Sequence, residues 1–160
     1  MTKARSTSRD ICLEELVYLE LLRTTDMLSR RIVQVLKKQE LSPTQYNVLR
    51  ILRGAPDGLP CGEIANRMIT RDPDVTRLLD RLERRKLIER GRDPQDRRTV
   101  MAKITREGLR LLGRLDQPIL QMHRTQLGHL GTERLRTLET LLQEARKLQP
   151  LQTTDHDSVI

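Results

Sequence analysis

The stretch DVTRLLDRLERRKLIERGRDPQDRRTVMAKI, residues 74–104, joins a helical pattern to a strand–turn–strand pattern. The residue before a proline avoids the helical region, so the sequence predicts Asp72 as N-cap and Pro73 as the first residue of a helix reaching about Arg85. Segments 87–92 and 99–104 read as strands around a turn at residues 93–96. The stretch therefore predicts a helix followed by a β-hairpin.

The predicted helix separates apolar from charged side chains. Its apolar face carries Val75, Leu78, Leu79 and Leu82, and its charged face carries Arg77, Asp80, Arg81 and Arg84. Because an α-helix fits the major groove of DNA and reads it mainly with N-terminal residues, Asp74, Thr76 and Arg77 are candidates near base edges. Arg81 and Arg84 suit phosphates. The alternative is a solvated charged face on which Asp80 pairs with Arg84.

The tip of the predicted hairpin is basic, with Asp96 followed by Arg97 and Arg98. Arginine at the end of a thin ribbon can enter the minor groove of DNA, where negative potential is concentrated. Asp96 can accept hydrogen bonds from Arg98 and hold it extended. The alternative is a basic surface hairpin that binds nothing.

Helices are expected on both sides of this stretch. A long amphipathic helix covers residues 11–38, and Ser42, Pro43 and Gln45 form the capping box of a second helix that stops at Gly54. A short helix with Ile64, Ala65 and Met68 on one face then precedes the helix at 73–85, which gives a helix-turn-helix. Thr105 caps another long helix, and Gly128 and Gly131 separate it from a last amphipathic helix reaching Leu148.

These elements predict a mainly α fold with a small β-hairpin wing: a winged helix-turn-helix with an all-helical dimerisation region. We expect a single domain over residues 11–148, with the DNA-binding lobe at 42–104, the helical dimerisation region at 11–38 and 105–148, and flexible tails at 1–10 and 149–160.

The charge balance favours a polyanionic partner. The 160 residues have a formal net charge of +8. Residues 67–110 hold 14 Lys and Arg against 8 Asp and Glu, so most of the excess lies around the predicted helix and hairpin. Double-stranded DNA is the expected partner. Two Tyr, with no Trp or Phe, are too few rings for the stacking surfaces that bind single strands.

Other classes lack their sequence signatures. No apolar run is long enough to span a membrane and the first ten residues are polar, so we expect a cytoplasmic protein with no membrane partner. Cys12 and Cys61 form no disulfide framework, and cysteine and histidine spacings fit no metal site, so no metal or cofactor is expected. An enzyme is not expected. A basic module that binds membranes or partner proteins remains the second alternative.

The run Asp74-Val75-Thr76-Arg77-Leu78-Leu79-Asp80-Arg81-Leu82-Glu83, followed by Leu87-Ile88-Glu89-Arg90, Asp96-Arg97-Arg98 and Ile104-Thr105-Arg106-Glu107-Gly108, resembles the multiple-antibiotic-resistance regulator (MarR) family over about residues 11–148. The resemblance implies a homodimeric regulator, commonly a repressor, with one recognition helix per half-site of a pseudo-palindromic operator. It implies Arg98 in the minor groove supported by Asp96, and contacts from Thr76 and Arg77. Activation remains open.

Two positions depart from the family pattern. Lys86 stands where the family usually has glycine, and a left-handed backbone there would cost a non-glycine residue roughly 1 kcal/mol. Either the strain is tolerated or the helix ends differently. Pro73 stands where many members have a small polar residue.

The resemblance implies control by a small phenolic or lipophilic effector or by cysteine oxidation. Cys12 lies roughly where hydroperoxide-sensing relatives keep a reactive cysteine, and the alternative is an ordinary small apolar residue. The sequence assigns no residues to an effector pocket.

Overall fold

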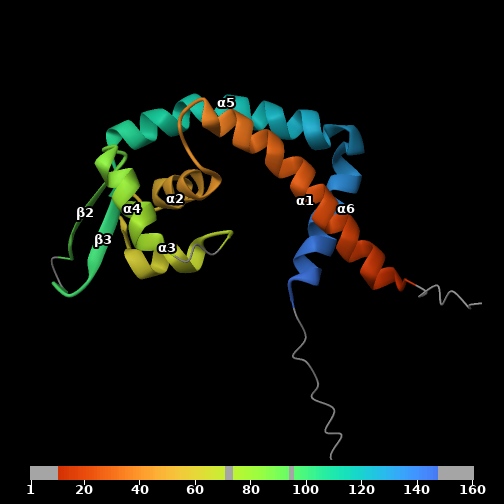
Figure 1. Ribbon diagram of the computed structural model, residues 1–160, viewed down its shortest axis with the longest axis horizontal. Helices are drawn as coiled ribbons and strands as arrows, with labels where there is room; N and C mark the ends of the chain where they lie inside the picture. The colour runs from red at the N-terminus through yellow and green to blue at the C-terminus, as the bar shows by residue number, and fades with distance from the viewer. Residues whose placement is uncertain (1–10, 71–73, 94–95, 148–160) are drawn as a thin grey trace, which may run out of the picture. The chain divides into compact units, whose positions relative to one another are not determined.

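The computed structural model describes residues 11–70, 74–93 and 96–147. They form two compact units, one ending at Met122 and one beginning at His123, which are described separately. The elements (Figure 1) are α1 (Leu13–Lys37), α2 (Pro43–Arg53), β1 (Leu59–Pro60), α3 (Cys61–Arg67), α4 (Val75–Arg84), β2 (Ile88–Arg92), β3 (Val100–Ile104), α5 (Arg106–Leu127), the 3-10 helix η1 (Gly128–Leu130) and α6 (Gly131–Ala145). The predicted mainly α fold with a small β-wing is confirmed.

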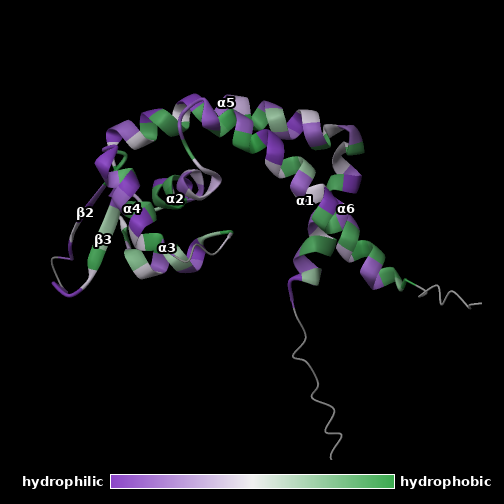
Figure 2. Ribbon diagram, viewed as in Figure 1, coloured by the Kyte–Doolittle hydropathy of each residue, from purple (hydrophilic) through white to green (hydrophobic). Residues whose placement is uncertain are grey.

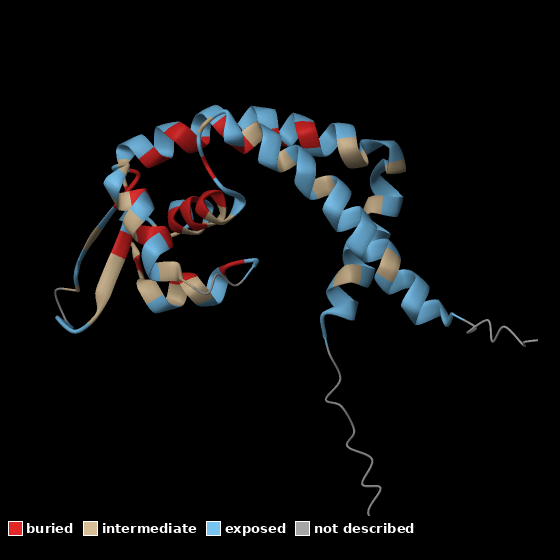
Figure 3. Ribbon diagram, in the orientation of Figure 1, coloured by how far each residue is buried: buried red, intermediate tan, exposed pale blue. Residues whose placement is uncertain are grey.

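The core of the first unit lies between α2, α4 and the sheet. Figure 3 shows buried positions on α2, on α4 and along α5. The most deeply buried side chains are Leu36, Val48, Leu49, Leu52, Ile64, Leu79, Leu82, Ile88 and Leu112. They come from five helices and one strand, so burial of the α4 apolar face fixes which face of this helix stays in solvent.

The sheet has three antiparallel strands in the order β1-β3-β2, one more than the predicted hairpin. Ile88 pairs with Ile104 and Arg92 with Val100, within the two predicted strands, whereas Leu59 of β1 pairs with Ala102. β1 was missed because two residues ending in a proline carry no strand periodicity. Gly58, at φ +91°, turns the chain into β1, and a Cβ there would lie 2.9 Å from the Ala102 carbonyl oxygen.

The predicted helix starts are confirmed at α2 and α5. The Ser42 hydroxyl accepts the Gln45 N–H and the Gln45 side chain accepts the Ser42 N–H, so the capping box is complete. The Thr105 hydroxyl accepts the Gly108 N–H at the start of α5.

The predicted start of α4 was wrong. Its N-cap is Asp74, whose carboxylate accepts the Arg77 N–H at 3.0 Å, and the helix begins at Val75. Asp72 and Pro73, the predicted cap and first residue, lie outside the described residues. The physical reason is that both aspartates can cap, and Asp74 is three residues before an amide that it reaches directly.

The end of α4 is left-handed at Lys86, with φ 57°. Lys86 N–H donates to the Glu83 carbonyl and Leu87 N–H to the Leu82 carbonyl, which is the Schellman arrangement normally built around glycine. The same pair of bonds closes α1 around Glu40, with φ 52°. The first sequence alternative therefore holds at Lys86: the strain is tolerated and the helix ends as the family pattern implies.

Most of α1 is exposed although its sequence is amphipathic. Leu36 is its one buried residue among those described. Figure 2 shows apolar positions repeating along the helix, and the exposed ones are Leu13, Leu16, Val17, Tyr18, Leu21, Leu22, Met27 and Val33. Among the described residues of the first unit, α1 therefore presents an apolar face that is exposed.

The second unit contains the end of α5, η1 and α6. The predicted break falls at Gly128–Leu130, and Gly131 takes φ 75°. No described residue of α6 is buried, and Leu141 is 56% exposed. Leu148 lies outside the described residues.

Replacing Lys86 with glycine tests the strain at the end of α4. We expect Lys86→Gly to raise the free energy of unfolding by about 0.5–1 kcal/mol, because glycine adopts positive φ without a Cβ clash. The midpoint of thermal unfolding should rise by about 2–4 °C. Lys86→Ala, which keeps the Cβ, is the matched control, and an equal gain in both variants would show that the side chain and not the backbone is responsible.

Candidate nucleic-acid interface

The outer face of α4 carries the predicted DNA-contacting side chains. Leu78, Leu79 and Leu82 are buried, while Thr76, Arg77, Arg81 and Arg84 are exposed. The separation into two faces is as predicted. Arg81 and Arg84 have no carboxylate partner within ion-pair distance among the described residues, so their charges face solvent.

The start of α4 links Asp74 to Arg77. Besides capping the helix, the Asp74 carboxylate lies 2.9 Å from Nε of Arg77, whose side chain is 78% exposed. Asp74, which was predicted near base edges, lies at the start of α4, and its carboxylate is engaged with Arg77. The Arg77 guanidinium is held over the first turn by this pair, where an approaching polyanion competes with Asp74 for it.

Arg90 of β2 joins the sheet to α4, and sequence reasoning missed it. Its guanidinium donates to both Asp80, at 2.5 Å, and Glu83, at 2.7 Å, while its own N–H donates to Glu83 at 3.1 Å. These side-chain hydrogen bonds, that of Glu83 foremost, raise the pKa of Arg90. The arginine therefore fixes β2 to α4.

The partner of Asp80 differs from the sequence alternative. Asp80 pairs with Arg90, and Arg84 donates only to the Asp80 main-chain carbonyl, at 3.4 Å. The predicted Asp80–Arg84 pair was wrong because a helical wheel compares only residues of the same helix. A signal was present: Arg90 lies two residues after buried Ile88, so strand alternation turns a charged residue inward, where it needs a partner.

The wing tip is organised by Asp96. One carboxylate oxygen accepts the Arg98 main-chain N–H at 3.0 Å and the other accepts the Thr99 hydroxyl at 2.8 Å. The Thr99 hydrogen bond, then that of Arg98, lowers the pKa of Asp96. The expected Asp96–Arg98 hydrogen bond is thus present, through the main chain. Arg97 and Arg98 are exposed, and residues 94–95 lie outside the described residues.

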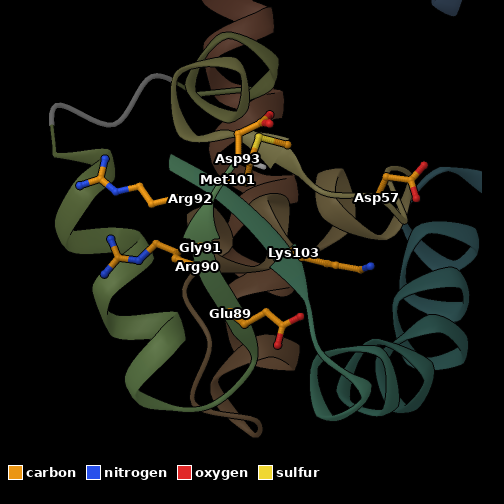
Figure 4. Close-up of a pocket in the computed structure, with 8 residues that line it drawn as sticks. All are labelled: Asp57, Glu89, Arg90, Gly91, Arg92, Asp93, Met101 and Lys103. Atoms are coloured by element: carbon orange, nitrogen blue, oxygen red, sulfur yellow. The ribbon is translucent and has the colours of Figure 1, made fainter. Parts of the chain in front are cut away.

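The sheet also forms an open groove, drawn in Figure 4. It is lined by Asp57, Glu89, Arg90, Gly91, Arg92, Asp93, Met101 and Lys103. Figure 4 shows Arg90 and Arg92 pointing toward α4 and Lys103 pointing toward Asp57. Three acidic side chains face three basic ones around the groove, so it lacks the single sign of charge that concentrates a charged ligand.

The two cysteines lie apart from this interface. Cys12 is the exposed N-cap residue of α1. A backbone hydrogen bond and, to a smaller extent, the Cys12 side chain lower the pKa of Glu14. Burial raises the pKa of the half-buried Cys61 thiol. Over residues 11–70, 74–93 and 96–147 no cluster of His, Cys, Asp and Glu could hold a metal ion. No helix in the same part of the chain is long and apolar enough to cross a membrane.

Comparison with known proteins places this geometry in a family. The family model described as "MarR family" matches residues 41–100, which include α2, β1, α3, α4 and β2 and end at the first residue of β3. A MarR transcription factor from Planctomyces limnophilus is 40% identical, and the match covers 83% of this chain and 97% of that one with a TM-score of 0.65. The chain belongs to the MarR family. The winged helix-turn-helix is therefore that of a MarR-type transcription regulator.

Two further MarR-like structures share the fold. The transcriptional repressor CouR, solved on a 23-mer DNA duplex, is 24% identical, with coverage of 91% and 100% and a TM-score of 0.71. BpsR of Bordetella bronchiseptica, a protein whose DNA binding is regulated by 6-hydroxynicotinic acid, is 22% identical. The match covers 86% of this chain and 98% of that one, with a TM-score of 0.77.

The ion pairs of Arg90 with Asp80 and Glu83, which form the Arg90 hub, can be tested through the stability of the protein. We expect Arg90→Ala to lower the free energy of unfolding by about 1–3 kcal/mol, because Asp80 and Glu83 lose a shared, partly buried partner and repel each other. Denaturant unfolding followed by circular dichroism measures the loss. The control is Arg110→Ala, which breaks the exposed Arg110–Glu107 pair and should change stability by less than about 0.5 kcal/mol. Similar small effects in both variants would contradict the role of Arg90.

Proposed function

We propose that this MarR-family chain is a homodimeric, sequence-specific repressor that binds double-stranded operator DNA in the cytoplasm. The observation that carries the proposal is the Arg90 hub, which fixes an exposed arginine face and a basic wing within one unit. Major-groove reading needs a helix presented at a defined angle, and minor-groove entry needs a wing at a defined distance from it. A single side chain supplies both constraints.

Roles for individual residues follow from their positions. Thr76 and Arg77 contact base edges from the first turn of α4, with Asp74 capping the helix and orienting Arg77. Arg81 and Arg84, further along the exposed face, bind phosphates. Arg98 enters the minor groove with Arg97 beside it, and Asp96 holds the main chain of the tip in place.

The homodimer is supported by the apolar face of α1. The exposed apolar side chains of α1 form a run that a monomer leaves in water, and such patches mark association surfaces. A second copy of the chain is the simplest partner because a two-fold axis brings two recognition helices to the half-sites of a pseudo-palindrome.

Release from DNA is assigned to a small aromatic or lipophilic effector, with cysteine oxidation as the alternative. The effector is supported by BpsR, because 6-hydroxynicotinic acid regulates the DNA binding of that protein. Among the described residues, the Glu14 carboxylate, whose pKa Cys12 helps to lower, lies close to Cys12, and this neighbour does not favour oxidation because reactive cysteines occupy electropositive sites. Binding is stoichiometric in this proposal, without turnover.

The wing contact predicts how one variant responds to salt. Arg98→Ala should weaken binding to the duplex upstream of the chain's own gene by about 1–3 kcal/mol and reduce the slope of log affinity against log salt by about one. Fluorescence anisotropy measures both. Arg110→Ala removes an exposed arginine outside α4 and the wing and should leave both quantities unchanged.

The same titration decides between functions. Tight binding to the native duplex and weak binding to a scrambled one supports the regulator. Equal binding to both, together with binding to acidic phospholipid vesicles that survives Arg98→Ala, would replace the regulator with a general basic module.

Peroxide separates the two modes of release. We expect hydrogen peroxide to leave operator binding unchanged in both the wild type and Cys12→Ser, because among the described residues Cys12 lies close to the Glu14 carboxylate, whereas reactive cysteines occupy electropositive sites. Gel shift after peroxide treatment measures this. Loss of binding by the wild type alone, with Cys12→Ser protected, would establish redox control through Cys12.

A further inference from the structure

Arg85 connects the end of the recognition helix to the end of α1. It is the C-cap residue of α4, and its guanidinium donates to two consecutive main-chain carbonyls, Glu40 at 2.5 Å and Gln39 at 3.0 Å. The residues are 45 and 46 positions apart in the sequence. The contact is therefore tertiary, and nothing in the local pattern of α4 predicts it.

The carbonyls that Arg85 binds have a local reason to be available. They lie past the last turn of α1, where the helix supplies no amide partner. The left-handed Glu40 reverses the chain there, and Leu41 N–H returns to the Leu36 carbonyl at 3.2 Å. A cation at this position also meets the negative end of the α1 dipole. The end of α1 is thus a ready acceptor site for a guanidinium.

We propose that Arg85 is a positioning residue that sets the angle of α4 relative to α1, and through it the spacing of the two recognition helices. This inference rests on the proposed homodimeric DNA-binding function. A planar guanidinium that binds two neighbouring acceptors fixes direction as well as distance. Since α1 carries the apolar face assigned to the partner subunit, the Arg85 contact ties the dimer axis to the DNA-reading helix.

A direct phosphate contact is the competing role for Arg85. The residue follows Arg84 and lines a shallow hollow with Glu40, Gln45, Arg81 and Arg84. Its donors, however, already point at the two carbonyls, whereas Arg84 has no carboxylate partner in the described part of the chain. The two roles differ in salt dependence, because loss of a phosphate contact lowers the salt slope and loss of a positioning contact does not.

The first experiment needs neither DNA nor the dimer. Spin labels at Arg30→Cys on α1 and Arg81→Cys on α4, in a Cys12→Ser, Cys61→Ser background and diluted with unlabelled chain, report the distance between the helices by pulsed electron paramagnetic resonance. Arg85→Met, which keeps the stem and removes the donors, should broaden or shift the distance distribution. Arg84→Met should leave it unchanged, and an unchanged distribution in Arg85→Met would overturn the inference.

The second experiment measures the consequence on DNA. Wild type, Arg85→Met, Arg85→Lys and Arg84→Met are titrated with the operator and with duplexes in which one base pair is added or removed between the half-sites. Arg85→Met should lose roughly tenfold in its preference for the native spacing, the scale of one charge-assisted hydrogen bond, with the salt slope unchanged. Arg85→Lys should recover part of it, because lysine reaches one acceptor at a time.

The outcomes distinguish failure of the Arg85 inference from failure of the proposed function. Weaker binding of Arg85→Met to every duplex, with a salt slope reduced by about one as in Arg84→Met, would make Arg85 a phosphate contact and overturn positioning. Failure of the wild type to prefer its operator would instead contradict the proposed function, and the spin-label distances would still decide whether Arg85 orients α4. Thermal unfolding of each variant confirms that the measurements are made on folded protein.

Discussion

The position of α4 against the sheet depends on the Arg90 guanidinium, which is held between Asp80 and Glu83. It brings a strand residue and a helix face together and balances two carboxylates that would otherwise lie among the basic residues of α4. The exposed face of the helix is left positive as a result. Because the Glu83 carboxylate also accepts the Arg90 N–H, the strand is fixed in direction as well as in position. The contact therefore links β2 to α4 through both the side chain and the main chain of Arg90.

A second constraint acts at the junction where α4, β2 and α5 meet. The Thr105 hydroxyl donates to the Lys86 carbonyl while accepting the Gly108 N–H, and Thr105 N–H donates to the Leu87 carbonyl. A Cβ on Gly108 would come within 2.3 Å of the Leu87 oxygen, so glycine is required for α5 to approach this closely. The strained backbone of Lys86 is retained because the residues around it over-determine its conformation.

The arginines of the basic stretch are of two kinds, those paired within the protein and those facing solvent. Arg85 and Arg90 are both arginines of the basic stretch, yet their charges are used inside the molecule, one on carbonyls and one on carboxylates. Arg77 is shared with Asp74, and Arg81 and Arg84 remain directed at solvent. The net charge of +8 is thus divided between side chains that build the surface and side chains that a polyanion can meet.

The sequence by itself determined the order of helices, the capping box of α2, the two faces of α4 and the wing strands, because each depends on residues within a few positions of one another. It also determined the family, through motifs contained in continuous segments. Only the tertiary structure decided that Asp80 pairs with Arg90, that Leu59–Pro60 adds a third strand, and that Arg85 reaches the end of α1. These contacts join residues that are distant in the chain or that carry no periodic pattern, and their partners are fixed only when burial of the common core brings the elements together.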